Sequence, residues 1–184
     1  MPTMLSHPAV AIGLLPWFRQ IAEYRAILLT GMALAILPDI DVVGFKLGVP
    51  YGHLFGHRGF SHSLFAALLL GGVMAWWLCR TRDIPFKTTW LYLFICMASH
   101  GVLDAMTNGG LGIAFLSPFS NERFFLPFQP IKVSSLTVQH FFGQHGLNVL
   151  SSELIWIWLP VLPIFLAGMY LRRQSNRLVY DETG

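Results

Sequence analysis

The stretch "AILLTGMALAILPDIDV", residues 26–42, decides the fold. It is an apolar run without a charged residue until it closes on two carboxylates, Asp39 and Asp41. Carboxylates at the boundary of such a run are costly unless a partner or a cation binds them. The stretch therefore predicts a membrane helix and, at one end of it, a polar site.

Composition supports a membrane protein. Of the 184 residues, 54% are hydrophobic and only 11% are charged, and the mean hydropathy is +0.57. A soluble domain carries about a quarter charged residues. The net charge of +3 is what basic residues flanking membrane spans produce, so we expect no nucleic acid partner.

The apolar segments predict an all-α fold, a polytopic membrane bundle of about four to five helices in one integral domain, 1–184. The expected helices and loops cover most of the chain. Helices are expected at about 5–19, 22–38, 60–79, 87–104 and 150–172, and loops at 39–59 and 105–149. Pro16 interrupts the first segment, which either spans the membrane or lies in its interface. The pattern does not indicate an oligomeric state.

Basic residues assign the two sides of the membrane. Eight of the twelve fall in short connections on one side: Arg19, Arg25, Arg80, Arg82, Lys87, Arg172, Arg173 and Arg177. The positive-inside rule places that side in the cytoplasm. The two long loops then face the opposite, non-cytoplasmic side.

Six histidines and four carboxylates that are candidate ligands fall at that opposite side. They are His7, Asp39, Asp41, His57, His62, His100, Asp104, His140, His145 and Glu153. Imidazole and carboxylate together are typical ligands of zinc and related divalent ions. The pattern predicts a metal site at one membrane face.

Two motifs give the strongest candidates. In "ASHGVLDAMTNGG", residues 98–110, His100 and Asp104 stand four apart and share one face of a helix. In "GHRGFSHSL", residues 56–64, two histidines stand close together, and Ser61 or Ser63 could cap the following helix. The simpler alternatives are a His–Asp pair that joins helices and a hydrated loop with incidental histidines.

The remaining candidates rest on weaker patterns. Asp39 follows Pro38 and could be only a turn residue. His7 is a lone histidine before an apolar segment, and Glu153 could be a ligand or a buried hydrogen-bonding group. Arg58 and Arg123 are candidate anion clamps, since a guanidinium matches phosphate geometry, although lipid headgroup contact is the alternative.

Four motifs in this order carry a family resemblance: "LPDIDV", "HRGFSHSL", "SHGVLDAMTNGG" and "SPFSNERFFLPF". Over about residues 1–130 the chain resembles the YdjM-like family of inner-membrane-associated, predicted metal-dependent hydrolases. That family is thought to be distantly similar to the zinc-dependent phospholipase C and single-strand nuclease superfamily. The resemblance implies a bacterial inner membrane location and metal roles for Asp39 or Asp41, His57, His62, His100 and Asp104.

This chain departs from the soluble superfamily enzymes in two ways. Those enzymes use a processed N-terminal amine and a His-x-x-x-Glu pair near the end. No clear processing site is seen here, and neither His140 nor His145 stands four residues before Glu153.

The expected function is a membrane-bound metal-dependent hydrolase acting on a phosphoester of a lipid or lipid-linked substrate. We expect two divalent ions, zinc or manganese, that activate a water. Asp39 or Asp41 would bridge or act as general base, and Arg58 or Arg123 would bind the anion. His7 is the weakest of the expected ligands.

Two other classes stay open. A transporter or other ion-binding membrane protein also places His and Asp within the membrane, but it needs polar steps across the whole thickness. A structural metal site would hold the helices together with a closed ligand shell.

Overall fold

The computed structural model describes residues 1–134 and 143–183 of the chain. Within these residues the fold is all-α, and the only β pairing is two isolated bridges. The predicted fold class is therefore confirmed.

The helices follow one another with short connections except around the two long loops. The elements are α1 (Pro8–Leu14), η1 (Leu15–Trp17), α2 (Arg25–Ile36), η2 (Leu37–Val42), α3 (Val43–Lys46), η3 (Phe60–His62), α4 (Leu64–Thr81), α5 (Phe86–Ala105), α7 (Gln144–Glu153), η4 (Leu154–Trp158) and α8 (Leu159–Thr183).

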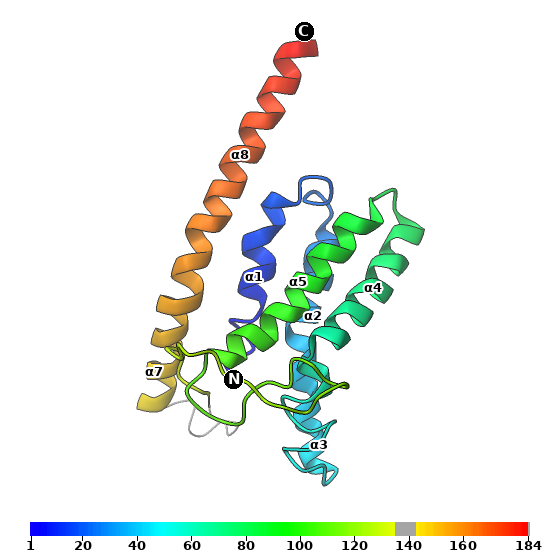
Figure 1. Ribbon diagram of the computed structural model, residues 1–184. Helices are drawn as coiled ribbons and strands as arrows, with labels where there is room; N and C mark the ends of the chain where they lie inside the picture. Colours follow the sequence, from blue (N-terminus) through cyan, green and yellow to red (C-terminus); the bar gives the residue numbers. More distant parts are fainter. Residues whose placement is uncertain (135–142, 184) are drawn as a thin grey trace.

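Three helical stretches among the described residues are long and apolar enough to cross a membrane. They are Arg25–Lys46, Leu64–Thr81 and Gln144–Arg177, whereas Pro8–Trp17 is shorter. Helix α5 packs against α1, α2 and α4, and α8 contacts α1 and η1 before it continues beyond the bundle (Figure 1). Helix α5 is therefore the element shared by the packed part of the bundle.

The helices depart from their expected bounds where proline or polar residues occur. The second expected helix, 22–38, ends as α2 at Ile36, and 3-10 turns follow because Pro38 has no N–H to continue the α-helical pattern. The expected loop 39–59 consequently begins with helical turns. The last helix begins at Gln144 rather than 150, since a helix can extend past its apolar part into polar sequence. The first regular helix begins later than expected, at Pro8.

The two ends of the bundle carry different elements (Figure 1). The connections from α1 to α2 and from α4 to α5 lie at one end. The N-terminus, α3, α7 and the segment that follows α5 lie at the other. The short connections and the long loops thus lie at opposite ends of the bundle.

Glycines allow the helices to approach closely. A Cβ on Gly71 of α4 would lie 3.0 Å from the backbone nitrogen of Phe94 in α5, whereas one on Gly72 would meet only the Trp90 side chain, at 3.4 Å. Small residues at such contacts let membrane helices pack backbone to backbone. The packing of α4 on α5 therefore depends on Gly71 and not on its neighbour.

We predict that Gly71→Val lowers the thermal stability of the protein in detergent. The added methyl groups meet backbone that cannot rotate away, and overpacking of this kind costs about 1–3 kcal/mol. Gly72→Val is the matched control and should leave the melting temperature nearly unchanged. Equal melting temperatures for the two variants would contradict the close contact of α4 and α5.

Candidate metal centre

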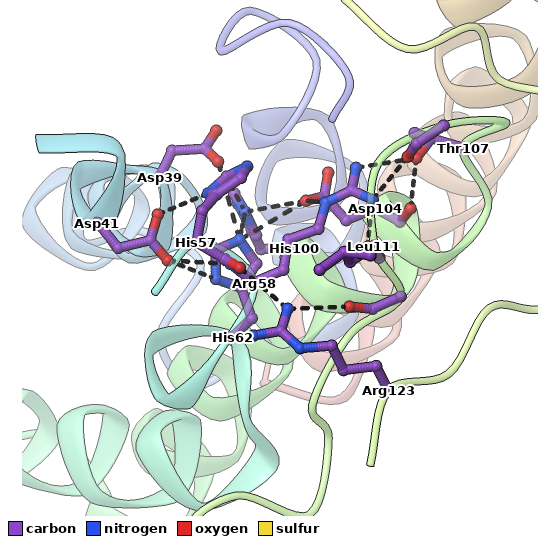
Figure 2. Close-up of polar contacts among 12 residues, drawn as sticks. Asp39, Asp41, His57, Arg58, His62, His100, Asp104, Thr107, Leu111 and Arg123 are labelled. Carbon is purple, nitrogen blue, oxygen red and sulfur yellow. Dashed lines mark hydrogen bonds and ion pairs between the residues drawn. The ribbon is translucent and has the colours of Figure 1, made fainter. Parts of the chain in front are cut away.

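Four buried side chains from three elements meet at the end of the bundle that carries the long loops. They are Asp39 of η2, His62 of η3, and His100 and Asp104 of α5 (Figure 2). One ligand atom from each lies within 4.8 Å of all the others. The structure thus brings together residues that are up to 65 positions apart in the chain.

Local backbone geometry accounts for this convergence. His100 and Asp104 are one turn apart on α5, with Nε2 and Oδ2 4.0 Å apart. The turns after Pro38 place the buried Asp39 beside α5. The loop before His62 is compact, because a Cβ on Gly59 would overlap the carbonyl oxygen of Leu54.

The distances within this cluster suit ligands around one ion. His100 Nε2 lies 3.3 Å from Asp39 Oδ1, and His62 Nε2 lies 3.6 Å from Asp104 Oδ2. The two imidazole Nε2 atoms are 3.0 Å apart. Ligands about 2.0–2.1 Å from a tetrahedral zinc are separated by about 3.3 Å. The four donors therefore match the ligand set of a divalent ion.

The outer contacts of the two imidazoles leave both Nε2 atoms facing the cluster. His100 Nδ1 lies 2.8 Å from the carbonyl oxygen of Ala35, to which it donates, so Nε2 carries the lone pair. His62 Nδ1 lies 3.0 Å from Ser61 Oγ and 3.2 Å from Asp41 Oδ2, which leaves its Nε2 facing the cluster. Such outer partners are typical of metal-binding histidines.

Asp41 differs from Asp39 in its contacts. It accepts hydrogen bonds from His57 Nδ1 at 2.6 Å, Ser61 Oγ at 2.5 Å and the backbone N–H of Arg58 at 3.2 Å. Asp41, His57 and His62 also form a possible ligand group. However, their short contacts are hydrogen bonds as they stand, so Asp41 orients the two histidines.

Ser61 and Ser63 have different roles, and the sequence left open which of them caps the following helix. Ser63 caps α4, since its hydroxyl oxygen accepts the N–H of Ala66 at 3.0 Å. Ser61 instead donates to Asp41. A helix cap is recognisable from sequence, whereas the Ser61 contact depends on how η2 lies against η3.

His7 lies on the far side of the same two carboxylates. Its ring stacks on that of His100 with centroids 3.8 Å apart. Its Nε2 lies 3.7 Å from Asp39 Oδ2 and 3.9 Å from Asp104 Oδ1, whereas Asp39 Oδ1 and Asp104 Oδ2 face His62 and His100. His7 Nε2 thus lies near the oxygens of Asp39 and Asp104 that do not face His62 and His100.

Several buried polar atoms of these residues have no hydrogen-bond partner among the described residues. They are both ring nitrogens of His7, both carboxylate oxygens of Asp39, and Asp104 Oδ1. Unpaired buried polar atoms are costly, and unpaired carboxylate oxygens more so. The chemistry of the donor set and these unpaired atoms both fit divalent cations.

The surroundings shift the pKa values of two histidines in opposite directions. Burial and the nearby His100 lower the pKa of His7 to about 3, so its imidazole is neutral. Burial by itself lowers the pKa of His62, but its interactions with the three surrounding aspartates raise it to about 10. A cation that binds His62 therefore displaces a proton.

Glu153 takes a structural role near the site. Its carboxylate is buried and accepts hydrogen bonds from the hydroxyl groups of Thr3 and Ser6, each at 2.6 Å. These bonds attach the N-terminal segment to α7 and thereby hold the adjacent His7 in place. Of the two roles that the sequence allowed for Glu153, it has the hydrogen-bonding one.

The other late histidines are not part of the cluster in the described residues. His145 Nε2 lies 3.2 Å from the carbonyl oxygen of Val133, to which it is placed to donate. His140 lies outside the described residues.

Arg58 is buried beside the cluster. Its Nε donates to Asp104 Oδ2 at 3.1 Å, Nη1 donates to the carbonyls of Gly109 and Leu111, each at 2.8 Å, and Nη2 donates to Thr107 Oγ1 at 3.0 Å (Figure 2). The guanidinium therefore neutralises one carboxylate and holds the segment after α5. Arg58 also adopts a left-handed backbone, with φ 64°, which is uncommon for a residue with a side chain.

Arg123, which lies in the segment after α5, holds the loop that carries His57 and Arg58. It donates to the carbonyl oxygens of His57 at 3.0 Å and Tyr51 at 3.1 Å. Both arginines thus donate hydrogen bonds to backbone carbonyls. Anion binding by Arg58 or Arg123 stays a prediction.

A cavity of about 140 Å³ adjoins the cluster, lined in part by His57, Arg58, Tyr51 and Gly110. It is smaller than the roughly 300–1,000 Å³ typical of drug-sized ligands. It suits a compact group such as a phosphate.

The sequence motifs did not indicate two residues at the site. Tyr51 lines the cavity, and its ring makes an edge contact with that of His57. Thr107 connects Arg58 with the carbonyl oxygen of Asp104. The position of Thr107 three residues after Asp104 is a signal that could have indicated it, but no pattern marks Tyr51.

These observations define a helical membrane protein with a buried cluster of aspartates and histidines that could hold metal. The chain belongs to the YdjM inner membrane protein family, which matches residues 1–175. The match extends beyond the region of about 1–130 that carries the motifs. Membrane location follows from the family and from the apolar helices.

Two relatives have related sequences. Inner membrane protein YbcI of Escherichia coli (strain K12) is 40% identical over 176 residues, which cover 95% of this chain and all of that protein. Uncharacterized protein YvsG of Bacillus subtilis (strain 168) is 34% identical over 95 residues, which cover 48% of this chain and 56% of that protein. No solved structure matches.

We predict that Arg58→Met strongly destabilises the fold. It leaves the Asp104 carboxylate without its buried partner, and breaking one side of a buried ion pair costs about 3–5 kcal/mol. Thermal unfolding in detergent measures the effect. Arg123→Met is the control, since this half-buried arginine has no carboxylate partner in the described residues, and its melting temperature should fall less. A larger fall for Arg123→Met would contradict the central role of the Arg58–Asp104 pair.

Proposed function

We propose that this protein is a membrane-bound metal-dependent hydrolase that cleaves a phosphoester of a lipid or lipid-linked substrate. One observation carries the proposal: Asp39, His62, His100 and Asp104 converge in a buried group, and both oxygens of Asp39, one of Asp104 and the ring nitrogens of the adjacent His7 have no hydrogen-bond partner among the described residues. Such an arrangement is costly without cations. The described neighbourhood offers one buried guanidinium, that of Arg58, against three carboxylates.

The proposed site holds two ions. The first position has four donors: Asp39 Oδ1, His62 Nε2, His100 Nε2 and Asp104 Oδ2. The second has three: His7 Nε2 and the other oxygens of Asp39 and Asp104. Mixed nitrogen and oxygen donors favour zinc, and manganese is the alternative.

The two positions differ in whether they leave a coordination site free for water. Four protein ligands are typical of a structural zinc, whereas a catalytic zinc keeps one position for water. The three-donor position at His7 therefore carries the proposed chemistry. A divalent ion there would supply an acidified water and stabilise negative charge on a phosphoryl oxygen.

The protein's own residues have separate tasks in this proposal. Asp39 and Asp104 would each hold both ions, because one oxygen of each lies near His7 and the other near His62 or His100. Asp41 orients His57 and His62 through its hydrogen bonds. Of the two aspartates that the sequence left as bridging candidates, Asp39 is therefore the better placed.

The location of the site supports a membrane-borne substrate. The cluster lies where candidate spans end, and the adjoining cavity suits a phosphate-sized group. By the positive-inside rule, this end faces the non-cytoplasmic side. The proposed substrate is therefore a lipid phosphoester of that leaflet.

The structural alternative has one observation in its favour, the closed four-donor position. It predicts bound metal without turnover. A transport function has less support, because the described core between α2, α4 and α5 away from the cluster is apolar, with residues such as Ile27, Leu78 and Leu93. An ion path requires polar groups through that region.

We predict about two divalent ions per wild-type chain by elemental analysis. His7→Phe keeps the aromatic stack on His100 but removes one donor, so it should retain about one ion. Asp104→Ala should lose both. His145→Ala is the control and should match wild type. Two ions in His7→Phe would contradict the second position.

We predict metal-dependent turnover of phospholipid or generic phosphodiester substrates by the purified protein with added zinc or manganese. Chelation and His100→Ala should each abolish it, and His7→Phe should lower kcat by at least a hundredfold because it removes the open position. His145→Ala should keep wild-type rates. Bound metal with no turnover on any of these substrates would favour the structural alternative.

A further inference from the structure

The loop that carries His57 and Arg58 also carries two aromatic rings, of which Phe55 is exposed and Phe60 is partly buried. Phe55 and Phe60 flank these two residues, and they contact each other with ring centroids 6.0 Å apart. Phe60 contacts Phe65 at 6.2 Å, and Phe65 contacts Phe119 at 5.7 Å. We call Phe55, Phe60, Phe65 and Phe119 the aromatic ladder.

The aromatic ladder continues the lipid-facing surface of a candidate span. Phe65 is the second residue of α4, whose exposed side includes Leu64, Leu68 and Leu69. Phe119 contacts Phe65 within the first turn of that span, so it lies at the level where the apolar stretch begins. The ladder therefore joins the wall of the bundle to the loop at the site.

The outer rings of the ladder are unusually exposed. Phe119 is 83% exposed and Phe55 is 61% exposed. An isolated exposed apolar side chain needs no explanation, but a contiguous apolar surface marks an interaction site. Aromatic rings are favoured at the membrane interface.

The backbone holds the Phe119 segment against both the span and the site loop. The N–H of Leu64, at the start of α4, donates to the carbonyl oxygen of Phe115 at 3.0 Å. The N–H of Ala114 donates to the carbonyl oxygen of Arg58 at 3.1 Å. The position of Phe119 relative to the membrane is thus set by the same loop that carries Arg58.

We propose that the aromatic ladder is immersed in the lipid leaflet and receives the acyl chains of a membrane lipid whose headgroup reaches the adjoining site. The statement that the headgroup reaches the site rests on the proposed function. It deepens that function by specifying a substrate that enters laterally from the leaflet. Lipid is the occupant because the ladder is continuous with the apolar side of α4.

Photocrosslinking tests the position of the ladder without any catalytic readout. The full-length protein, with p-benzoylphenylalanine in place of Phe119, is reconstituted in vesicles of phosphatidylethanolamine and phosphatidylglycerol and irradiated. The matched control carries the same group in place of the exposed polar Asn121. Mass spectrometry should find several-fold more lipid adduct at position 119. Equal adducts, or crosslinks mainly to another protein or a second copy of this chain, would overturn the proposal.

Steady-state kinetics then test whether the aromatic ladder delivers the lipid substrate to the site. Phe119→Ser should raise KM severalfold for a phospholipid in vesicles, with kcat unchanged, and leave KM for a soluble short-chain phosphodiester as in wild type. Phe119→Leu should restore the vesicle KM. An equal KM change on both substrates would overturn lateral entry. Lipid adducts at position 119 without turnover by wild type would instead count against the hydrolase function. They would still support the position of the aromatic ladder in the lipid leaflet.

Discussion

The buried carboxylate of Asp104 is the group on which the site end of the molecule depends. It lies on α5, the helix that packs against α1, α2 and α4, and one of its oxygens accepts a hydrogen bond from Arg58. Arg58 in turn binds the carbonyls of Gly109 and Leu111, so the chain folds back over the end of its own helix. One charge that must be compensated in an apolar setting thereby organises two loops.

The same constraint applies to Asp39, which has no arginine partner in the part of the chain that the structure describes. Its two oxygens face His62 and His100 on one side and His7 on the other, without hydrogen bonds. Asp41, two residues later, is fully engaged by its hydrogen-bond donors. Two neighbouring carboxylates therefore have different roles, one open to a cation and one orienting the imidazoles around it.

Much of the site could be predicted from single motifs. His100 and Asp104 share a helix face because of their spacing, and Ser63 is placed as a cap by its position before α4. The distinction between Asp39 and Asp41 could not be predicted, because a 3-10 turn rather than an α-helix follows Pro38. Hydrogen bonding of Arg123 to loop carbonyls likewise depends on contacts across about 70 residues.

The sequence by itself determined that the protein lies in a membrane, that it is helical, and that many of its ionisable residues gather at one end. These properties follow from composition and from local spacing. Only the tertiary structure decided which oxygen of Asp39 faces which histidine, that His7 stacks on His100, and that Glu153 anchors the N-terminal segment. The physical reason is distance: a ligand or hydrogen-bond role is set within a few tenths of an ångström between side chains on different helices. Packing alone fixes such separations.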